Sequence, residues 1–170
     1  NCPANNLPTV NAPTNITGGS ANGFTITTCV NSNLCFNLQT ADPNNTQVVT
    51  TWWSMNIPGA TFTQLGNPTV TDTIVGTLGN PPTAVFCWTP TATGTYSFLM
   101  TTTDDACPII GSNQFTVQII VGNLEGTANV VNNGCGTVTL CADSLTGIAP
   151  FSFSWTGGGN LGSNPQAQDS

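Results

Sequence analysis

The chain has 170 residues, of which 38% are hydrophobic, so it is long enough for one or two domains with a buried core. It contains no Lys, Arg or His and seven acidic residues, which give a net charge of -7. Binding to nucleic acid or to an anionic membrane needs cations that neutralise phosphates, so both partners are excluded. Without His or Lys the chain also lacks the usual general base, Schiff-base amine and zinc ligand, and we expect neither an enzyme nor a cofactor.

The chain contains short runs of β-branched and aromatic residues separated by Pro, Gly and Asn clusters, and no window has a capped helical period. This pattern predicts an all-β fold, an antiparallel sandwich of two sheets. In chain order the predicted strands cover 24–27, 34–38, 48–55, 84–88, 95–102 and 114–121.

The seven cysteines are typical of disulfides in an oxidising compartment, which predicts an extracellular location. Their spacing also indicates an internal repeat. Cys135 lies 106 residues after Cys29, and Cys141 lies 106 residues after Cys35. Cys107, within ACP, lies 105 residues after Cys2, within NCP.

A repeat of this length is one sandwich domain. We therefore expect tandem repeats, in which residues 1–18 are the tail of a preceding repeat and its linker, 19–122 form one complete Ig-like repeat, and 123–170 begin a truncated third repeat.

Strand alternation places Cys35 opposite the apolar face of its strand, and Cys87 likewise, so a cross-strand disulfide on the outer face of one sheet would join them. Among the three connectivities of four cysteines, this pair leaves Cys29 for Cys107. The partners of the three other cysteines are expected outside this chain: Cys2, Cys135 and Cys141.

Several motifs together resemble the Ig-like or PKD-like repeats of giant surface proteins of gliding Bacteroidota, including gliding adhesins exported by the type 9 secretion system. The motifs are TCVNSNLCFNL, IPGATF, VFCWTPTATGTYSF and TTDDACP, followed by QFTVQIIV. GTY, which contains Tyr96, is similar to the tyrosine corner of Ig-like sandwiches. The resemblance implies a disulfide-bonded stalk or adhesive filament at the cell surface, with no catalytic residues.

Two groups of side chains were weighed as ligand sites. Asp104 and Asp105 are weak candidates for calcium, because one adjacent pair supplies few of the six to eight oxygens that Ca²⁺ takes, and a solvated turn is the simpler interpretation. Trp52 and Trp53 are adjacent, so one should point into the core and one outward, where it is a weak candidate for stacking on a sugar.

Surface proteins of the phylum that the motifs resemble carry O-linked sugars at Asp-Ser or Asp-Thr followed by an aliphatic or small residue. Asp72-Thr73-Ile74 and Asp143-Ser144-Leu145 fit this pattern. Thr73 and Ser144 are therefore the expected acceptors, although both dipeptides are also common in turns.

These observations predict a protease-resistant spacer of a long cell-surface filament or adhesin that acts in adhesion or gliding motility. Trypsin-like proteases have no site in a chain without Lys and Arg, and disulfides limit the local opening that other proteases need. The expected partners are neighbouring repeats of the same chain, other filament copies and surface glycans. The alternative is a glycan-binding module of an adhesin.

Overall fold

The structure is a computed structural model that describes residues 5–54, 56–123, 125–132 and 138–146, the last two ranges by their backbone. Every described element is a β-strand. The described residues contain no helix long and apolar enough to cross a membrane. The chain divides into two compact units, Asn1–Gly122 (unit 1) and Asn123–Ser170 (unit 2). The predicted all-β class is therefore confirmed for the described residues.

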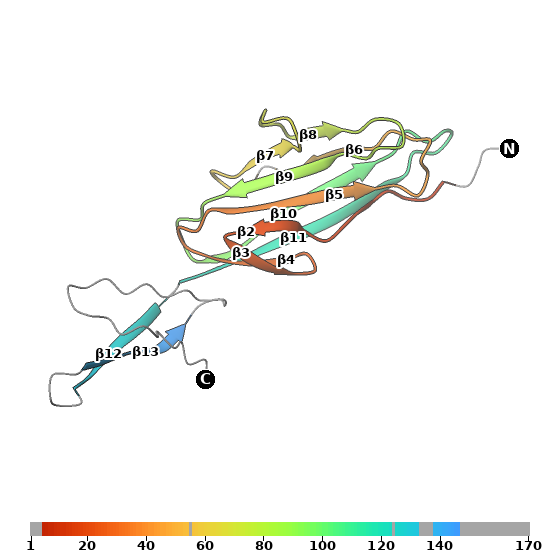
Figure 1. Ribbon diagram of the computed structural model, residues 1–170. Coiled ribbons are helices and arrows are strands. Elements are labelled where there is room, and N and C mark those ends of the chain that lie inside the picture. The colour runs from red at the N-terminus through yellow and green to blue at the C-terminus, as the bar shows by residue number, and fades with distance from the viewer. Residues whose placement is uncertain (1–4, 55, 124, 133–137, 147–170) are drawn as a thin grey trace. The chain divides into compact units, whose positions relative to one another are not determined.

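Unit 1 consists of two sheets (Figure 1). In the first sheet the strands follow the order β1-β5-β9-β7, and β2 also pairs with β5. Its members are β1 (Thr9–Val10), β2 (Thr14–Thr17), β5 (Leu34–Ala41), β7 (Thr61–Gln64) and β9 (Thr83–Trp88).

The second sheet has six strands in the order β3-β4-β11-β10-β6-β8. Its pairs are antiparallel except for β4 and β11, which run parallel. Its members are β3 (Gly19–Asn22), β4 (Thr25–Cys29), β6 (Thr50–Trp53), β8 (Thr73–Val75), β10 (Gly94–Thr103) and β11 (Ser112–Gly122).

The chain passes from the first sheet to the second at Gly18, between β2 and β3. Gly18 has a φ of 70°, a conformation that L side chains rarely adopt, and a Cβ there would collide with the backbone of Asn33. Gly18 therefore allows the chain to cross between the sheets, and the strand pattern of the sequence did not predict this crossing.

The structure corrects the predicted N-terminal boundary. β1 and β2 pair with β5, so residues 9–17 belong to the same sandwich as 19–122 and are not the tail of another domain. The sequence did not predict these two strands because they have only two and four residues. They are also mostly polar and are preceded by Pro, so they show no strand pattern. Backbone pairing along the edge of β5 holds them.

Unit 2 contains β12 (Glu125–Asn132) and β13 (Val138–Thr146), which pair with each other in antiparallel fashion. The segments 106 residues earlier do not pair with each other: 19–26, which covers β3 and the start of β4, lies in the second sheet, and 32–40, which covers most of β5, lies in the first. That 123–170 begins another copy of unit 1 stays a prediction.

Aromatic side chains join the two sheets of unit 1. Phe62 of β7 stacks on Trp53 of β6 with ring centroids 4.4 Å apart. It meets Phe86 and Phe98 edge to face at 5.0 and 4.9 Å. Phe36 stacks on Phe86 at 4.8 Å. Because β6 and β10 belong to one sheet and β5, β7 and β9 to the other, these rings form the contact between the layers.

We expect Phe62→Ala to lower the free energy of unfolding by about 3 to 5 kcal/mol, because it leaves a cavity between three buried rings. Urea unfolding followed by tryptophan fluorescence measures this, and Phe62→Leu provides a milder variant if the alanine variant does not fold. Leu65→Ala is the control, since Leu65 is 59% exposed. A loss below about 1 kcal/mol for Phe62→Ala would contradict the central position of this ring.

Candidate functional site

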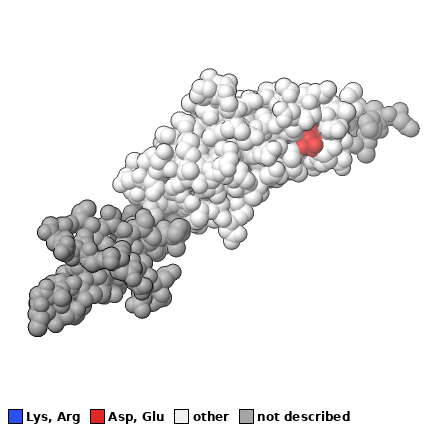
Figure 2. Space-filling model, viewed as in Figure 1, with Lys and Arg blue, Asp and Glu red and all other residues white. Residues whose placement is uncertain are grey.

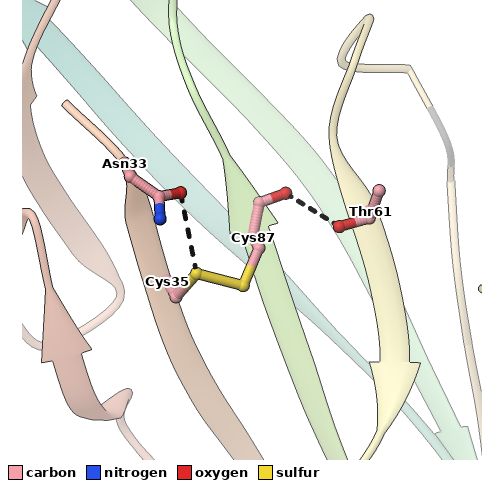
Figure 3. Close-up of a disulfide and its surroundings, with 4 residues drawn as sticks. All are labelled: Asn33, Cys35, Thr61 and Cys87. Carbon is pink, nitrogen blue, oxygen red and sulfur yellow. Dashed lines mark hydrogen bonds between the residues drawn. A yellow bond between two sulfur atoms is a disulfide. The ribbon is translucent and has the colours of Figure 1, made fainter. Parts of the chain in front are cut away.

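The outer face of the first sheet carries the predicted disulfide (Figure 3). Cys35 of β5 is the register partner of Cys87 of β9, and their sulfur atoms are bonded. Both side chains are half-buried, while their strand neighbours Phe36 and Phe86 are fully buried on the opposite face. The prediction from strand alternation is confirmed.

Thr61 of β7 extends this outer surface across β9. Its hydroxyl donates a hydrogen bond of 3.2 Å to the carbonyl oxygen of Cys87. On the other side, Asn33 Oδ1 lies 4.0 Å from Cys35 Sγ. The disulfide is thus a covalent link between two central strands of one sheet, flanked by the side chains of Asn33 and Thr61.

The apolar face of β9, opposite Cys87, is buried as predicted, and the tyrosine corner is present. Phe86 and Trp88 lie in the core at 0% and 6% exposure. Trp88 also donates from Nε1 to the carbonyl oxygen of Pro58 at 3.0 Å. The Tyr96 hydroxyl donates to the carbonyl oxygen of Ala92 at 3.2 Å, four residues upstream, which is the hydrogen bond of a tyrosine corner.

The predicted pairing of Cys29 with Cys107 is wrong, because within the described part of the chain neither is bonded and the two lie at opposite ends of the second sheet. Cys29 ends β4 beside Gly122, the last residue of β11. Cys107 lies in the connection between Thr103 of β10 and Ser112, the first residue of β11. The 11 residues of β11 span about 35 Å, far beyond the roughly 4 to 7 Å between Cα atoms that a disulfide allows.

The remaining cysteine predictions lie outside the described residues. Cys2 and Cys135 belong to the undescribed ranges, and Cys141 is described only as a backbone position of β13.

A polar cluster of Asn5, Asp42, Gln47, Asp104 and Asp105 lies at the end of unit 1 where the chain enters it. Asp104 is 4% exposed, and its Oδ1 accepts the backbone N–H groups of Ala106 and Gly111 at 3.0 and 2.8 Å. Its Oδ2 accepts the Asn5 side-chain amide at 2.9 Å. Asp104 therefore shapes the loop that connects β10 to β11 and fastens the N-terminal segment to it.

The other members of the cluster complete this attachment. Asn5 Nδ2 also donates to the carbonyl oxygen of Ile109 at 3.3 Å, and Asn5 Oδ1 accepts the side-chain amide of Gln47 at 3.0 Å. Asp105 Oδ1 accepts the backbone N–H of Val48 at 2.8 Å. On the face in Figure 2, the acidic atoms of the described residues form one small patch toward this end of unit 1.

Asp42 has one carboxylate oxygen without a hydrogen-bond partner. Its Oδ1 accepts the backbone N–H of Asn44 at 2.7 Å, but its buried Oδ2 has no hydrogen-bond partner. Burial raises the pKa of Asp42, the Asn44 hydrogen bond opposes this, and the charges of Asp104 and Asp105 raise the pKa further.

For calcium, Asp104 and Asp105 do not form a ligand set. Their oxygens accept the hydrogen bonds just described, and the described residues contain no group of three or more His, Cys, Asp or Glu side chains arranged to hold a metal. Asn5 and Gln47 were not predicted from the sequence, because Asn5 is separated from Asp104 by 99 residues and has no motif around it.

The adjacent tryptophans separate as predicted. Trp53 is 4% exposed and stacks on Phe62, whereas Trp52 is 40% exposed on the outer face of the second sheet. Of the expected glycosylation sites, Thr73 is an exposed residue of β8, and the Ser144 side chain lies outside the described residues. Glycosylation at both positions stays a prediction.

No protein-family model matches the sequence, and no curated protein matches it. Several solved structures resemble the chain, among them the following three. A conjugative transposon lipoprotein of Bacteroides eggerthii has a TM-score of 0.40 and 8% identity, covering 64% of this chain and 94% of its own.

The second is the ASH/PapD-like domain 7 of human CEP192, with a TM-score of 0.38 and 13% identity, covering 65% of this chain and 89% of its own. The third is AggA, the major subunit of Escherichia coli aggregative adherence fimbriae type I, with a TM-score of 0.38 and 17% identity, covering 71% and 97%. None of these similarities identifies a family for the chain.

We expect the double variant Cys35→Ala/Cys87→Ala to lose about 4 kcal/mol of unfolding free energy. The bond joins residues separated by 52 positions, and its removal frees the unfolded chain of that loop constraint. Urea unfolding of both proteins measures the difference. Cys107→Ser is the matched control and should change stability by less than about 0.5 kcal/mol, because Cys107 is free and exposed. A control loss of several kcal/mol would show that Cys107 has a disulfide partner.

Asp42→Asn should stabilise unit 1 at neutral pH. Since the folded state raises the pKa of Asp42, the folded protein holds this proton more tightly than the unfolded chain does. The ionised carboxylate therefore costs stability above the folded pKa, and this cost fades as the pH falls through it. Asn keeps an oxygen for the Asn44 N–H.

Unfolding curves at about pH 7 and about pH 3 test the sign: the advantage of Asp42→Asn should be present at the first and absent at the second. Asp72→Asn removes the same formal charge from an exposed position and is the control. Lower stability of Asp42→Asn at neutral pH would contradict the assignment.

Proposed function

We propose that unit 1 is a non-enzymatic spacer of a long extracellular surface protein, and that it carries tension along the chain. The observation that supports this most directly is the position of its two ends. β1 begins beside Ala41, at one end of β5, while β11 ends beside Cys29, at the turn that leads into the opposite end of β5. A module that the chain enters at one end and leaves at the other adds its own length to a filament.

Both ends are held by hydrogen bonds. At the N-terminal end Asn5 binds Asp104 and Ile109. At the other end the backbone N–H of Val30 donates to the carbonyl oxygen of Gly122 at 2.9 Å. A pull on the chain therefore meets fixed structure at each end of the unit.

A pull on the C-terminal end loads β11, which pairs with β10 on one side and, in parallel, with β4 on the other; the parallel pair of β4 and β11 reaches the last residue of β11. Their register runs from Thr25 beside Gln118 to Cys29 beside Gly122. Force along β11 acts along the strand axis and across these evenly spaced hydrogen bonds, so several of them resist it together. A hairpin pulled apart from one end would instead lose its bonds one at a time.

The disulfide gives the spacer a second property, because it sets a limit on extension. Once the sheets separate, the residues between Cys35 and Cys87 stay inside a covalent loop. The bond also supports an oxidising, extracellular compartment. Since the chain has no Lys or Arg, trypsin-like proteases find no cleavage site even in an extended chain.

The sequence motifs extend this proposal to the kind of protein. Their resemblance to the repeats of gliding adhesins supports a place in a Bacteroidota filament exported by the type 9 secretion system, acting in adhesion or gliding. Its partners would be neighbouring repeats of the same chain and other filament copies.

Single-molecule force spectroscopy on the intact chain, held by its two ends, tests the proposal. Unit 1 should unfold in one force peak. In Cys35→Ala/Cys87→Ala the length released should increase by about 180 Å, because 52 further residues extend at about 3.5 Å each.

Cys107→Ser should release the same length as the unaltered chain and serves as control. Extension of unit 1 without a force peak would contradict a load-bearing role. An unchanged release in the double variant would contradict the disulfide as the limit on extension.

A further inference from the structure

We propose that the outer face of the second sheet around Trp52 binds a neutral polysaccharide. The Trp52 side chain is 40% exposed on β6, and the other exposed aromatic and aliphatic groups of its neighbourhood come from adjacent strands of the same sheet. This inference does not depend on the spacer function, because it uses a different face and different residues from those that hold the ends of unit 1.

The register of the sheet fixes what surrounds the indole. Trp52 lies directly between Thr101 of β10 and Thr73 of β8. Leu99 and Val75 are its diagonal neighbours on the same strands and are 38% and 50% exposed. Diagonal neighbours on one face of a sheet lie within reach of a large aromatic ring. The indole is thus at the centre of a small apolar area.

Polar groups adjoin this area. Thr101 is only 5% exposed although strand alternation points it outward. Its register partners are Trp52 on one side and Gln114 of β11 on the other, and Gln114 Nε2 donates to its hydroxyl at 3.4 Å. Trp52 and Gln114 therefore flank Thr101, which holds the Gln114 amide two strands away from the indole on the same face. On the opposite side lies the exposed Thr73, whose hydroxyl donates to Asp72 Oδ1 at 3.1 Å and can still accept a hydrogen bond.

A pyranose ring matches this arrangement chemically. Its C–H face is apolar and stacks on an indole, while its hydroxyl groups at the ring edge exchange hydrogen bonds with side-chain hydroxyls and amides. Several strands side by side present such groups over a flat area, which suits successive sugars of a chain.

Charge selects the kind of polysaccharide. The register partners and diagonal neighbours of Trp52 are uncharged, the described acid that adjoins them is Asp72, which is bonded to Thr73, and the chain has no cation. An anionic polysaccharide would meet a chain of net charge -7 with nothing to neutralise it, and a second copy would bring the same charge. A neutral hexose polymer has no such penalty.

The test uses the intact chain and isothermal titration calorimetry with linear hexasaccharides of glucose, mannose and galactose, compared with hexagalacturonate as the anionic probe. We expect at least one neutral probe to bind, and Trp52→Ala to weaken that binding at least about tenfold by removing the stacking surface. Gln114→Ala should weaken it less. Hexagalacturonate should not bind.

Leu65→Ala is the matched control, since Leu65 is an exposed apolar residue that follows β7 in the other sheet, and it should bind the sugar like the unaltered chain. Urea unfolding of each variant establishes that it is folded. The proposal is overturned if no neutral probe binds, if Trp52→Ala binds equally well, or if the anionic probe binds as tightly. Sedimentation equilibrium gives one more contrary outcome: dimers that disappear in Trp52→Ala would assign this face to a second copy.

Discussion

The contact of aromatic rings between the two sheets is the constraint on which unit 1 depends. Phe62, Phe86 and Phe98 meet within 5.3 Å of one another, and they come from β7, β9 and β10. Burial of these rings fixes which face of each strand points inward. Every outward feature follows from that choice, including the position of Cys35 and Cys87 on one outer surface and of Trp52 on the other.

The two outer surfaces and the two ends of unit 1 have separate roles in this interpretation. The disulfide links the central strands of the first sheet, and the Asn5–Asp104 hydrogen bond and the β4–β11 pairing hold the ends. None of these uses the outer face of the second sheet. A spacer of this construction has a large surface free for binding, so a load-bearing role and recognition of a neutral glycan are compatible in one domain.

The polar cluster shows how a charged group serves the fold in a chain without cations. Asp104 is buried because backbone N–H groups and the Asn5 amide replace its water. Asp42 lacks such compensation at Oδ2, and its pKa rises. The cluster therefore fastens the N-terminal segment at some cost in stability at neutral pH.

The sequence by itself determined the strands with strong alternation, the inward side of each and the Cys35–Cys87 bond, because these depend on neighbours along the strand and on a period of two residues. The tyrosine corner followed from the resemblance of GTY to that of Ig-like sandwiches. Only the tertiary structure decided the rest. The distance between Cys29 and Cys107 depends on how β11 runs beside β4 and β10. The spacing of the cysteines in the sequence carries no information about strand direction. Likewise, β1 and β2 form by backbone hydrogen bonding to β5, and Asn5 donates a hydrogen bond to Asp104, 99 residues later in the sequence. Contacts between distant segments leave no local pattern to find.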